Sequence, residues 1–349
     1  MKFEWIDFYS EFATKLLLFK NDRKALIERI NDVYTAINMQ VPKLESGGDI
    51  IDIDPFTIFG LFNKGITNSN RIAIIRSIAN VFGIEAKVPN NFDGIPVLNN
   101  LKATFYAFKE DRKADDIDNI WNVFEAALRL ADNDTEQNRK EFSKWYDLVH
   151  DQRCIRWNIT MGLYWIRPYT YINLDSRNRW YISNVENMPA EFVNSIKKKI
   201  NKVPNATDYL FIKDACIKAL EVGSYEYKNY PELSYSAWIV SEQVNRQKAA
   251  ANGKKLSNAA FLRWFKPLIQ ALRDLGGSGT PAEARAKIVE NEQLSDEEVN
   301  AIRGKNNVNK FENEVAFARS YLVNAGYIDK SIYGCLLYTS PSPRDVEES

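Results

Sequence analysis

Histidine and cysteine are the scarcest functional residues of this chain. It has one His and three Cys among 349 residues. A single imidazole, that of His150, nearly excludes classical His-based metal sites and Ser-His-Asp or Cys-His catalysis. The three cysteines are odd in number and far apart, which fits a reducing cytoplasm and excludes a disulfide framework or a Cys-rich zinc site. We therefore expect a cytoplasmic protein with no catalytic residue, metal site or cofactor in this chain.

Long apolar runs and an excess of one charge sign are also missing. No segment approaches the ~20 apolar residues of a membrane helix, and the N-terminus, MKFEWIDFYSEF, lacks the apolar core of a signal peptide. The chain carries 46 Lys+Arg and 46 Asp+Glu. A net charge of zero argues against a protein that coats nucleic acid through bulk charge, and leaves room for a local basic face. We expect no membrane partner.

Aromatic residues, by contrast, are abundant. There are 8 Trp, 17 Tyr and 19 Phe. Such side chains build cores, or they stack against bases on a nucleic-acid surface. Composition alone leaves both interpretations open.

The apolar periodicity predicts a mainly α fold. Apolar residues recur at spacings of three and four, and Asn, Asp, Pro and Gly residues mark helix ends. The expected helices are 5–19, 21–38, 54–65, 70–81, 116–130, 135–149, 189–202, 208–222, 237–251, 262–275, 281–290, 295–302 and 311–324. In the last module, short helices, a longer final helix, and a turn and strand at 327–333 give the order of a winged helix-turn-helix with a small β wing.

Breaks in pattern divide the chain into regions. Residues 1–222 are expected to form a helical N-terminal domain, with a subdomain break near 85–115. Residues 223–260 are expected to be a linker and a connecting helix, because 223–236 are polar, Tyr-rich and contain Gly and Pro. Residues 261–334 are the winged-helix module.

Motifs for hydrolysis of nucleotides are missing from these residues. A P-loop needs an upstream Gly before Gly-Lys-Ser/Thr, and Gly253-Lys254 and Gly304-Lys305 lack it. A metal-dependent nuclease could use Asp with Glu-x-Lys. The triplets Glu85–Lys87 and Glu226–Lys228, the second with Asp214 upstream, are expected by chance in a chain this charged.

The remaining candidate groups have simpler structural explanations. The carboxylates around Asp54 and Asp116 are expected to cap helices and face solvent. His150 is expected to lie at a helix end or on the surface.

The segment from Arg167 to Trp180 mixes arginine with aromatic residues. Arg167, Arg177 and Arg179 could contact phosphates while the aromatics stack on bases. The alternative is a core helix pair in which Asp175 pairs with Arg177 or Arg179 to fix a turn. We slightly favour a core role for the aromatics and leave the arginines as weak DNA-binding candidates.

The winged-helix module supplies the main DNA-binding candidates. Winged helices place one helix in the major groove, with Asn and Arg reaching base edges and the loop and wing on phosphates. In the module's last helix, 311–324, the residues predicted to face the core are Phe311, Val315, Ala318 and Leu322. Those predicted to face outward are Asn313, Glu314, Phe317 and Arg319. The predicted DNA-binding residues are Arg303, Lys305, Asn306, Asn307, Lys310, Asn313, Arg319 and Lys330. The same module could instead dock a partner protein.

The last fifteen residues follow SIYG abruptly. Residues 335–349 read CLLYTSPSPRDVEES, and the string CLLYTSPSPRD resembles a translated sequencing-adapter read-through at the ends of metagenomic gene models. We expect the natural sequence to run only to about Gly334, with further domains missing. A genuine Ser/Pro tail is the alternative.

Residues 265–334 resemble the N-terminal winged-helix domain of the Mrr restriction protein. The shared pattern is a first helix, a Gly-rich turn (GGSG), LSDEE at 294–298, a basic loop, and a helix ending YLVNAG at 321–326. That family continues Gly-Val-Trp-x-Leu-Thr, whereas Cys335 follows Gly334 here.

The first ~220 residues resemble the N-terminal region of McrB-like AAA+ proteins of modification-dependent restriction systems. The resemblance rests on DIDPFTIFGLFNKG, FDGIPVLNNL and WNITMGLYWIRPYTYINLDSRNRWYI. It implies a specificity role ahead of a GTPase or ATPase motor that works with a separate nuclease subunit and self-assembles through the motor. The expected function is DNA recognition, including of modified DNA, by a non-enzymatic fragment that lacks the motor. A protein-interaction scaffold is the alternative.

Overall fold

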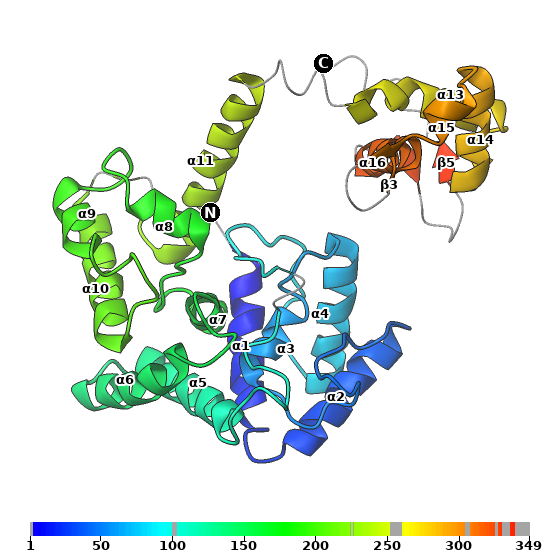
Figure 1. Cartoon of the computed structure of the whole chain (residues 1–349). Helices are drawn as coiled ribbons and strands as arrows, with labels where there is room; N and C mark the ends of the chain where they lie inside the picture. Colours follow the sequence, from blue (N-terminus) through cyan, green and yellow to red (C-terminus); the bar gives the residue numbers. More distant parts are fainter. Residues whose placement is uncertain are drawn as a thin grey trace. The chain divides into compact units, whose positions relative to one another are not determined.

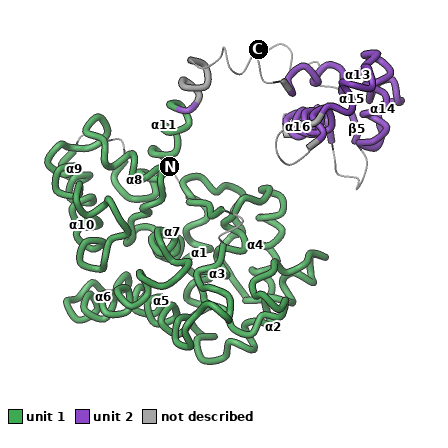
Figure 2. Tube along the Cα trace, in the orientation of Figure 1, with its two compact units in different colours: residues 1–244 green, residues 245–349 purple. Residues whose placement is uncertain are grey.

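The computed structural model describes residues 3–99, 103–223, 225, 227–251, 260–303, 308–324, 327–329 and 336–338. The chain forms two compact units, residues 1–244 (unit 1) and 245–349 (unit 2), shown in two colours in Figure 2. The fold class is mainly α, as predicted, with a few short strands in unit 2.

Unit 1 is built of helices joined by loops (Figure 1). The helices are α1 (Trp5–Leu17), α2 (Arg23–Ala36), α3 (Pro55–Gly60), α4 (Asn68–Phe82), α5 (Asp116–Asp132), α6 (Glu136–His150), α7 (Asn158–Ile166), α8 (Ser176–Ile182), α9 (Ala190–Ile196), α10 (Ala206–Val222) and α11 (Tyr230–Ala251). The expected helices up to residue 222 are confirmed, with boundary shifts of a few residues. Two further helices, α7 and α8, lie just before and at the end of the segment from Arg167 to Trp180 that mixes arginine with aromatic residues.

Short polar side chains begin several of these helices. Asp22, Thr67 and Thr135 accept hydrogen bonds from the backbone N–H groups three residues ahead. Asp54 accepts from the N–H groups of Phe56 and Thr57 at 2.8 and 3.0 Å. The expectation that Asp54 caps a helix is confirmed, because its oxygen satisfies N–H groups that have no partner within the helix. The expectation that Asp54 and Asp116 face solvent is wrong, since both are buried, and α5 has no side-chain cap.

The core of unit 1 is aromatic and continuous. Trp5, Phe12, Phe59 and Trp165 are fully buried in one cluster that draws on helices from α1 to α11. At Gly162 in α7, a Cβ atom would lie 2.6 Å from the Phe56 ring of α3, so only glycine allows these two helices to pack this closely. Most aromatics are therefore core residues, which decides the question that composition left open.

Two expected boundaries in unit 1 are wrong. Tyr227, Tyr230 and Leu233, in the segment predicted to be a linker, are buried in the unit 1 core. The Tyr230 hydroxyl donates to the backbone oxygen of Lys213 at 2.7 Å. Tyr-rich composition resembled a polar linker, but these rings close the core. The same core also includes residues on both sides of the predicted break near 85–115, so unit 1 is one body.

Unit 2 combines helices with two small antiparallel sheets. Its elements are the 3₁₀ helix η2 (Ala260–Trp264), α13 (Phe265–Asp274), β1 (Ser278–Gly279), α14 (Pro281–Asn291), α15 (Asp296–Val299), β2 (Ile302–Arg303), β3 (Val308–Asn309), α16 (Lys310–Asn324), β4 (Ile328–Asp329) and β5 (Leu336–Tyr338). The three-stranded sheet has the order β1–β5–β4, and β2 pairs with β3. This is the helix and strand order of a winged helix, with α16 as the final helix before the wing strands.

The module extends past the boundary that the sequence suggested. Strand β5 is the middle strand of the sheet: Leu336 pairs with Gly279 of β1, and Leu337 pairs with Asp329 of β4. Leu336 is also buried in the unit 2 core. The folded module therefore does not end at Gly334, whatever the origin of the residues that form β5.

Smaller corrections concern local structure in unit 2. The helix expected over 295–302 is only α15, and Ile302 and Arg303 lie in β2. The expected strand over 327–333 is described only at Ile328–Asp329. Among the described residues, no helix is long and apolar enough to span a membrane.

Candidate functional site

Helix α16 presents one face to the core of unit 2 and one to solvent. Phe311, Val315, Ala318 and Leu322 are buried, as predicted. Phe317 and Tyr321 lie on the opposite side with exposed fractions of 52% and 54%, and both rings contact Phe261 of η2. The helix is thus packed on one side and exposed on the other.

Glu314 was expected on the outward face, and this is wrong. Its side chain is buried, and its Oε2 accepts hydrogen bonds from Trp264 Nε1 at 3.0 Å and Arg263 Nη2 at 3.3 Å. Position 314 lies between the buried positions 311 and 318, and a buried indole N–H needs an acceptor. The carboxylate therefore fixes η2 against α16.

Only part of the predicted DNA-binding set lies among the described residues. Lys310, at the first position of α16, is exposed, and Asn313 and Arg319 on the same helix are partly exposed. Arg303 lies in β2, where its backbone alone is described. Lys305, Asn306, Asn307 and Lys330 lie outside the described residues. The structure brings Lys310, Asn313 and Arg319 onto one helix.

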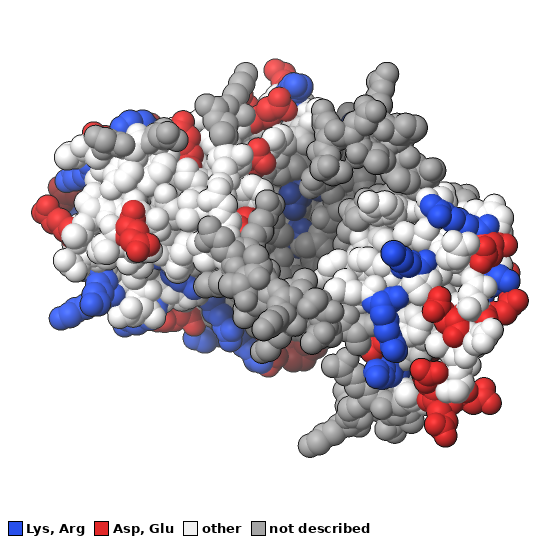
Figure 3. All heavy atoms as spheres, turned by 90° about the horizontal axis from the view of Figure 1, so that it is seen from above, with Lys and Arg blue, Asp and Glu red and all other residues white. Residues whose placement is uncertain are grey.

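Charge is segregated along unit 2. Residues 290–298 contain five acidic and no basic residues, whereas residues 299–311 contain three basic and no acidic ones. On the face drawn in Figure 3, Lys and Arg side chains of unit 2 follow one another, with Asp and Glu side chains concentrated beside them. A chain of zero net charge therefore has a local basic segment that leads into α16.

The three candidate arginines of unit 1 do not lie together. Arg167 is mostly buried, and its Nη1 donates to the Ser10 backbone oxygen at 3.1 Å while its Nε lies 3.7 Å from Asp132. It ties α7 to α1, a structural role that leaves it away from the pocket described next. Arg177 and Arg179 both line that pocket.

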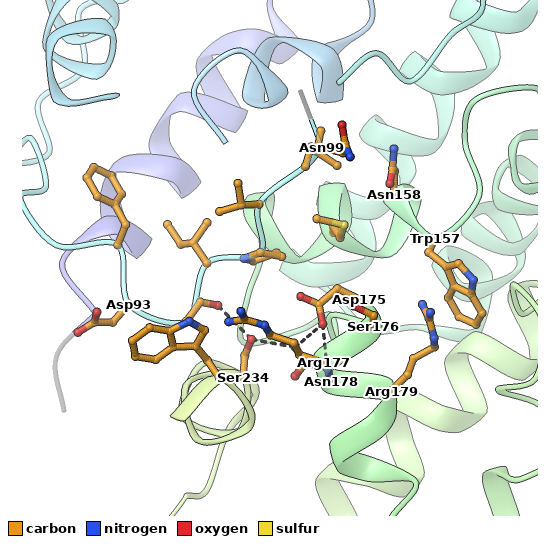
Figure 4. Close-up of a pocket in the computed structure, with 18 of the residues that line it drawn as sticks. Asp93, Asn99, Trp157, Asn158, Asp175, Ser176, Arg177, Asn178, Arg179 and Ser234 are labelled. Carbon is orange, nitrogen blue, oxygen red and sulfur yellow. Dashed lines mark hydrogen bonds between the residues drawn. The ribbon is translucent and has the colours of Figure 1, made fainter. Parts of the chain in front are cut away.

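The pocket has a volume of about 670 Å³, within the ~300–1,000 Å³ typical of small-molecule sites. Its walls come from the start of α4, the loop 92–99, the starts of α7 and α8, and the first half of α11. Figure 4 shows Arg177 extending from α8 toward α11, and Arg179 turned toward Trp157. Arg177 Nη2 pairs with Glu242 at 2.6 Å, and the Arg179 guanidinium lies 3.8 Å from the centre of the Trp157 ring. The expected pairing of Asp175 with these arginines is not what holds them: Asp175 caps α8 by accepting from Asn178.

The loop 92–99 is locked in place by side-chain donors from other elements. Trp5 Nε1 donates to Asp93 O at 3.0 Å, Trp165 Nε1 to Pro96 O at 3.1 Å, and Ser234 Oγ to Gly94 O at 3.0 Å. Gly94 has φ +73°, and a Cβ there would lie 3.2 Å from the Pro231 backbone oxygen. These bonds hold the pocket wall rigid before any ligand arrives.

Two further arginines of the pocket, Arg71 and Arg179, contact mainly backbone oxygens and aromatic rings. Arg71 Nε donates to Phe62 O at 2.8 Å and its guanidinium lies 4.9 Å from the Phe92 ring centre; Arg179 Nη1 donates to Leu174 O at 2.7 Å. The charge of Asp175 acts on Arg179, whereas no carboxylate among the described residues acts on Arg71. Burial lowers the pKa of both guanidinium groups below its usual value, because removal from water disfavours the charged form.

Comparison with family models identifies both units. Residues 5–240 match the family described as a domain of unknown function (DUF8425), which covers more than half of the chain. The chain belongs to the DUF8425 family. Residues 261–340 match the Mrr N-terminal domain, so unit 2 is similar to that domain, and the match extends through β5. No curated protein and no solved structure matches the chain.

The DUF8425 region therefore contains the whole pocket, since every lining residue falls within 68–238. Two of the three motifs that suggested a McrB-like protein, at 92–101 and 157–182, contribute lining residues. The family match does not include a McrB-like or AAA+ model.

Of the weaker catalytic candidates in the DUF8425 region, Asp214 has its carboxylate in structural ion pairs. Asp214 bonds to Arg139 at 2.6 Å and Lys213 at 2.9 Å, and Glu226 lies outside the described residues. The backbone N–H groups of Glu85 and Ala86 donate to the Glu11 carboxylate. His150 lies at the end of α6, 3.3 Å from Asp151. Among the described residues, no three His, Cys, Asp or Glu side chains are placed to hold a metal ion.

Sequence reasoning missed most of the pocket. Arg71, Trp157 and Trp238 line it but are separated by up to 167 positions, so no local motif marks them. The only available signal was the mixture of arginine and aromatic residues at 167–180, which pointed to two of the lining arginines.

Proposed function

We propose that the chain recognises DNA for a restriction-type defence system, and that α16 of unit 2 is the element that enters the major groove. The observation that carries the proposal is the match of residues 261–340 to the Mrr N-terminal domain. The sheet order β1–β5–β4 with α16 before the wing strands supports it, because winged helices present this helix to DNA.

The charges of α16 suit this role. Lys310, exposed at the first turn, lies where a lysine can contact a phosphate, and Asn313 lies one turn further along the same helix. Phosphate contacts supply affinity without sequence preference, and amide side chains read base edges. Arg319 would add a contact further along the helix, and Lys305 and Lys330 would add phosphate contacts from the loop and the wing.

We further propose that this chain performs no catalysis itself and needs no metal or cofactor. Nucleotide hydrolysis would come from a McrB-like motor that also assembles the subunits, and cleavage from a nuclease subunit. The scarcity of His and the ion pairs that occupy the Asp214 carboxylate support this division. The system would act on cytoplasmic DNA, including modified DNA.

Binding of a labelled 20-base-pair duplex by the full chain tests the DNA proposal. Lys310→Ala should weaken binding severalfold and equally for unrelated sequences. Lys287→Ala is the matched control: it also removes a lysine of unit 2, but from α14, where it pairs with Glu290 at 3.0 Å. Equal binding of both variants and the unchanged chain, or no duplex binding at all, would contradict the proposal.

One observation favours a second function, docking of a partner protein on α16. Phe317 and Tyr321 are half-exposed on the outer side of the helix and form an aromatic surface with Phe261. Such surfaces are common at protein interfaces. Under this alternative, Phe317→Ser would abolish capture of the partner, while Lys310→Ala would leave both partner capture and DNA binding unchanged.

A further inference from the structure

The pocket described above is lined by residues of unit 1 alone. It lies within 68–238, is walled by five segments, and has a loop that is fixed by donors from Trp5, Trp165 and Ser234. Preformed concave sites of this size are usually ligand sites.

The placement of the arginines in the pocket favours an anionic ligand. Three arginines and two aspartates line it. Arg177 is paired with Glu242. Arg71 is buried, with an exposed fraction of 6%, and its guanidinium donates to backbone oxygens and faces the Phe92 ring. Arg179 is half-buried, donates to Leu174 O, lies over the Trp157 ring and is acted on by the charge of Asp175. Arg71 is therefore a buried cation on which no described carboxylate acts, which is costly, and an anion in the pocket would offset that cost. Guanidinium groups suit phosphate oxygens in particular.

The remaining walls favour a planar heterocycle attached to that anion. Trp238, with an exposed fraction of 43%, packs against Tyr235 with a ring-centre distance of 6.0 Å and lines the pocket. Figure 4 shows Asn99, Asn158 and Asp175 among the polar side chains of the same site. Amide and carboxylate groups provide both donors and acceptors for the edge of a base, and an indole face provides a stacking surface. A bare inorganic anion would leave this apolar and amide wall unused.

We propose that this pocket binds a single nucleotide, with the phosphate held by Arg179 and Arg71 and the base stacked on Trp238. The nucleotide is either free or part of a DNA strand, since both present the same ring and phosphate. The pocket shares no residue with α16, so variants can test the two proposals separately.

Isothermal titration of the full chain with defined probes tests the proposal. The probes are the four deoxynucleoside monophosphates, the matching nucleosides, a 12-nucleotide single strand and a 20-base-pair duplex. We expect the monophosphates to bind at least tenfold more tightly than the nucleosides, because the nucleosides lack the group that the arginines hold. If the 12-nucleotide strand binds and the free monophosphates do not, the ligand is a nucleotide that is part of a DNA strand.

Matched variants assign the binding to the pocket. Trp238→Ala should weaken nucleotide binding about tenfold, as expected for loss of one base–aromatic stack. Trp180→Ala, which removes an equally exposed Trp (40%) from α8 outside the pocket lining, should leave it unchanged. Arg179→Gln should reduce the affinity for monophosphates to that for nucleosides, whereas Arg153→Gln, an exposed arginine paired with Asp111, should not.

Other results would overturn the inference. No binding of any nucleotide probe, or equal effects of Trp238→Ala and Trp180→Ala, excludes a nucleotide in this pocket. Lys310→Ala separates this inference from the proposed function, because it should weaken duplex binding while binding of monophosphates stays the same. Binding of the 12-nucleotide strand is assigned to the pocket only if Trp238→Ala removes it. If Lys310→Ala removes this binding and Trp238→Ala does not, the inference about the pocket fails and the proposal that unit 2 binds DNA stands.

Discussion

The two units differ in the size of their hydrophobic cores. Unit 1 buries a continuous aromatic core that links helices from α1 to α11, while the described core of unit 2 consists of twelve side chains around α13, α14 and α16. Hydrophobic stabilisation increases with the buried apolar area, so the hydrophobic contribution to the free energy of unfolding is large in unit 1 and small in unit 2. The large core of unit 1 positions the walls of the pocket. The small core of unit 2 positions α16 with one face exposed. The comparison predicts that unit 2 is far more sensitive to loss of any one element.

Loss of strand β5 should give the largest effect. A chain ending at Gly334 lacks Leu336 and the middle strand, which pairs with both β1 and β4. A core of this size supplies about 3–5 kcal/mol, so unit 2 should lose cooperative folding. Hydrogen exchange of α13 and α16 amides measures this, and their protection should disappear.

A chain ending at Ser340, where the match to the Mrr N-terminal domain ends, is the matched control. It keeps β5 and should protect α13 and α16 as the full chain does. Equal protection in the chain ending at Gly334 would mean that unit 2 folds without β5. The winged-helix module would then end near Gly334, as the sequence suggested.

Trp121→Ala should destabilise unit 1 by about 3–5 kcal/mol. The indole is fully buried, packs on Phe124 and donates from Nε1 to the Ile53 backbone oxygen at 3.0 Å. Urea unfolding followed by hydrogen exchange should show lower stability of α5 and unchanged stability of α13 and α16. A similar loss in both units would show that the two cores act as one, against the comparison.

Asp54 should make unit 1 less stable as pH rises. Burial raises the pKa of its carboxyl group from 3.8 to about 6, because Oδ2 has no partner within the described residues. The protonated form is favoured in the folded state, so its contribution is complete below pH 4 and is lost as pH rises through 6. A shift of about 2 pH units corresponds to about 3 kcal/mol.

Asp54→Asn should remove this dependence while keeping the cap, since an amide oxygen can still accept from Phe56 and Thr57. The free energy of unfolding of unit 1, measured from pH 4 to 7 for both proteins, tests it. Parallel curves would contradict a raised pKa for Asp54.

The smallest effect concerns helix caps. Thr280 and Glu283 form a reciprocal capping box at α14, and Thr280→Ala should cost about 1 kcal/mol. Thr135→Ala, at α6 of unit 1, should cost a similar amount. Thermal unfolding should nevertheless show that Thr280→Ala lowers the folded fraction of unit 2 more than Thr135→Ala lowers that of unit 1. Equal losses would contradict the difference in stability between the two units.

Helices were predictable from sequence because their signals are local. The apolar spacing and the caps at Asp22, Thr135 and Ser295 lie within the segments that they organise. The buried face of α16 followed from the same periodicity. Glu314 was misplaced because its partner, Trp264, lies fifty positions away, and a carboxylate on a helix usually faces solvent.

Long-range pairings were not predictable. Strand β5 has only three residues and is defined by its partners β1 and β4. Tyr227 and Tyr230 looked like linker residues because polar neighbours surround them, although their rings complete the core. The pocket depends on α4, α7, α8 and α11 meeting at one loop, which no single segment encodes.

The salt dependence of duplex binding by the full chain tests the central claim most directly, that α16 of unit 2 contacts DNA phosphates. The logarithm of the affinity should fall linearly with the logarithm of salt concentration, and Lys310→Ala should reduce that slope by about one phosphate contact. Lys287→Ala should leave the slope unchanged. A slope that Lys310→Ala does not alter, or binding that salt does not affect, would contradict the account.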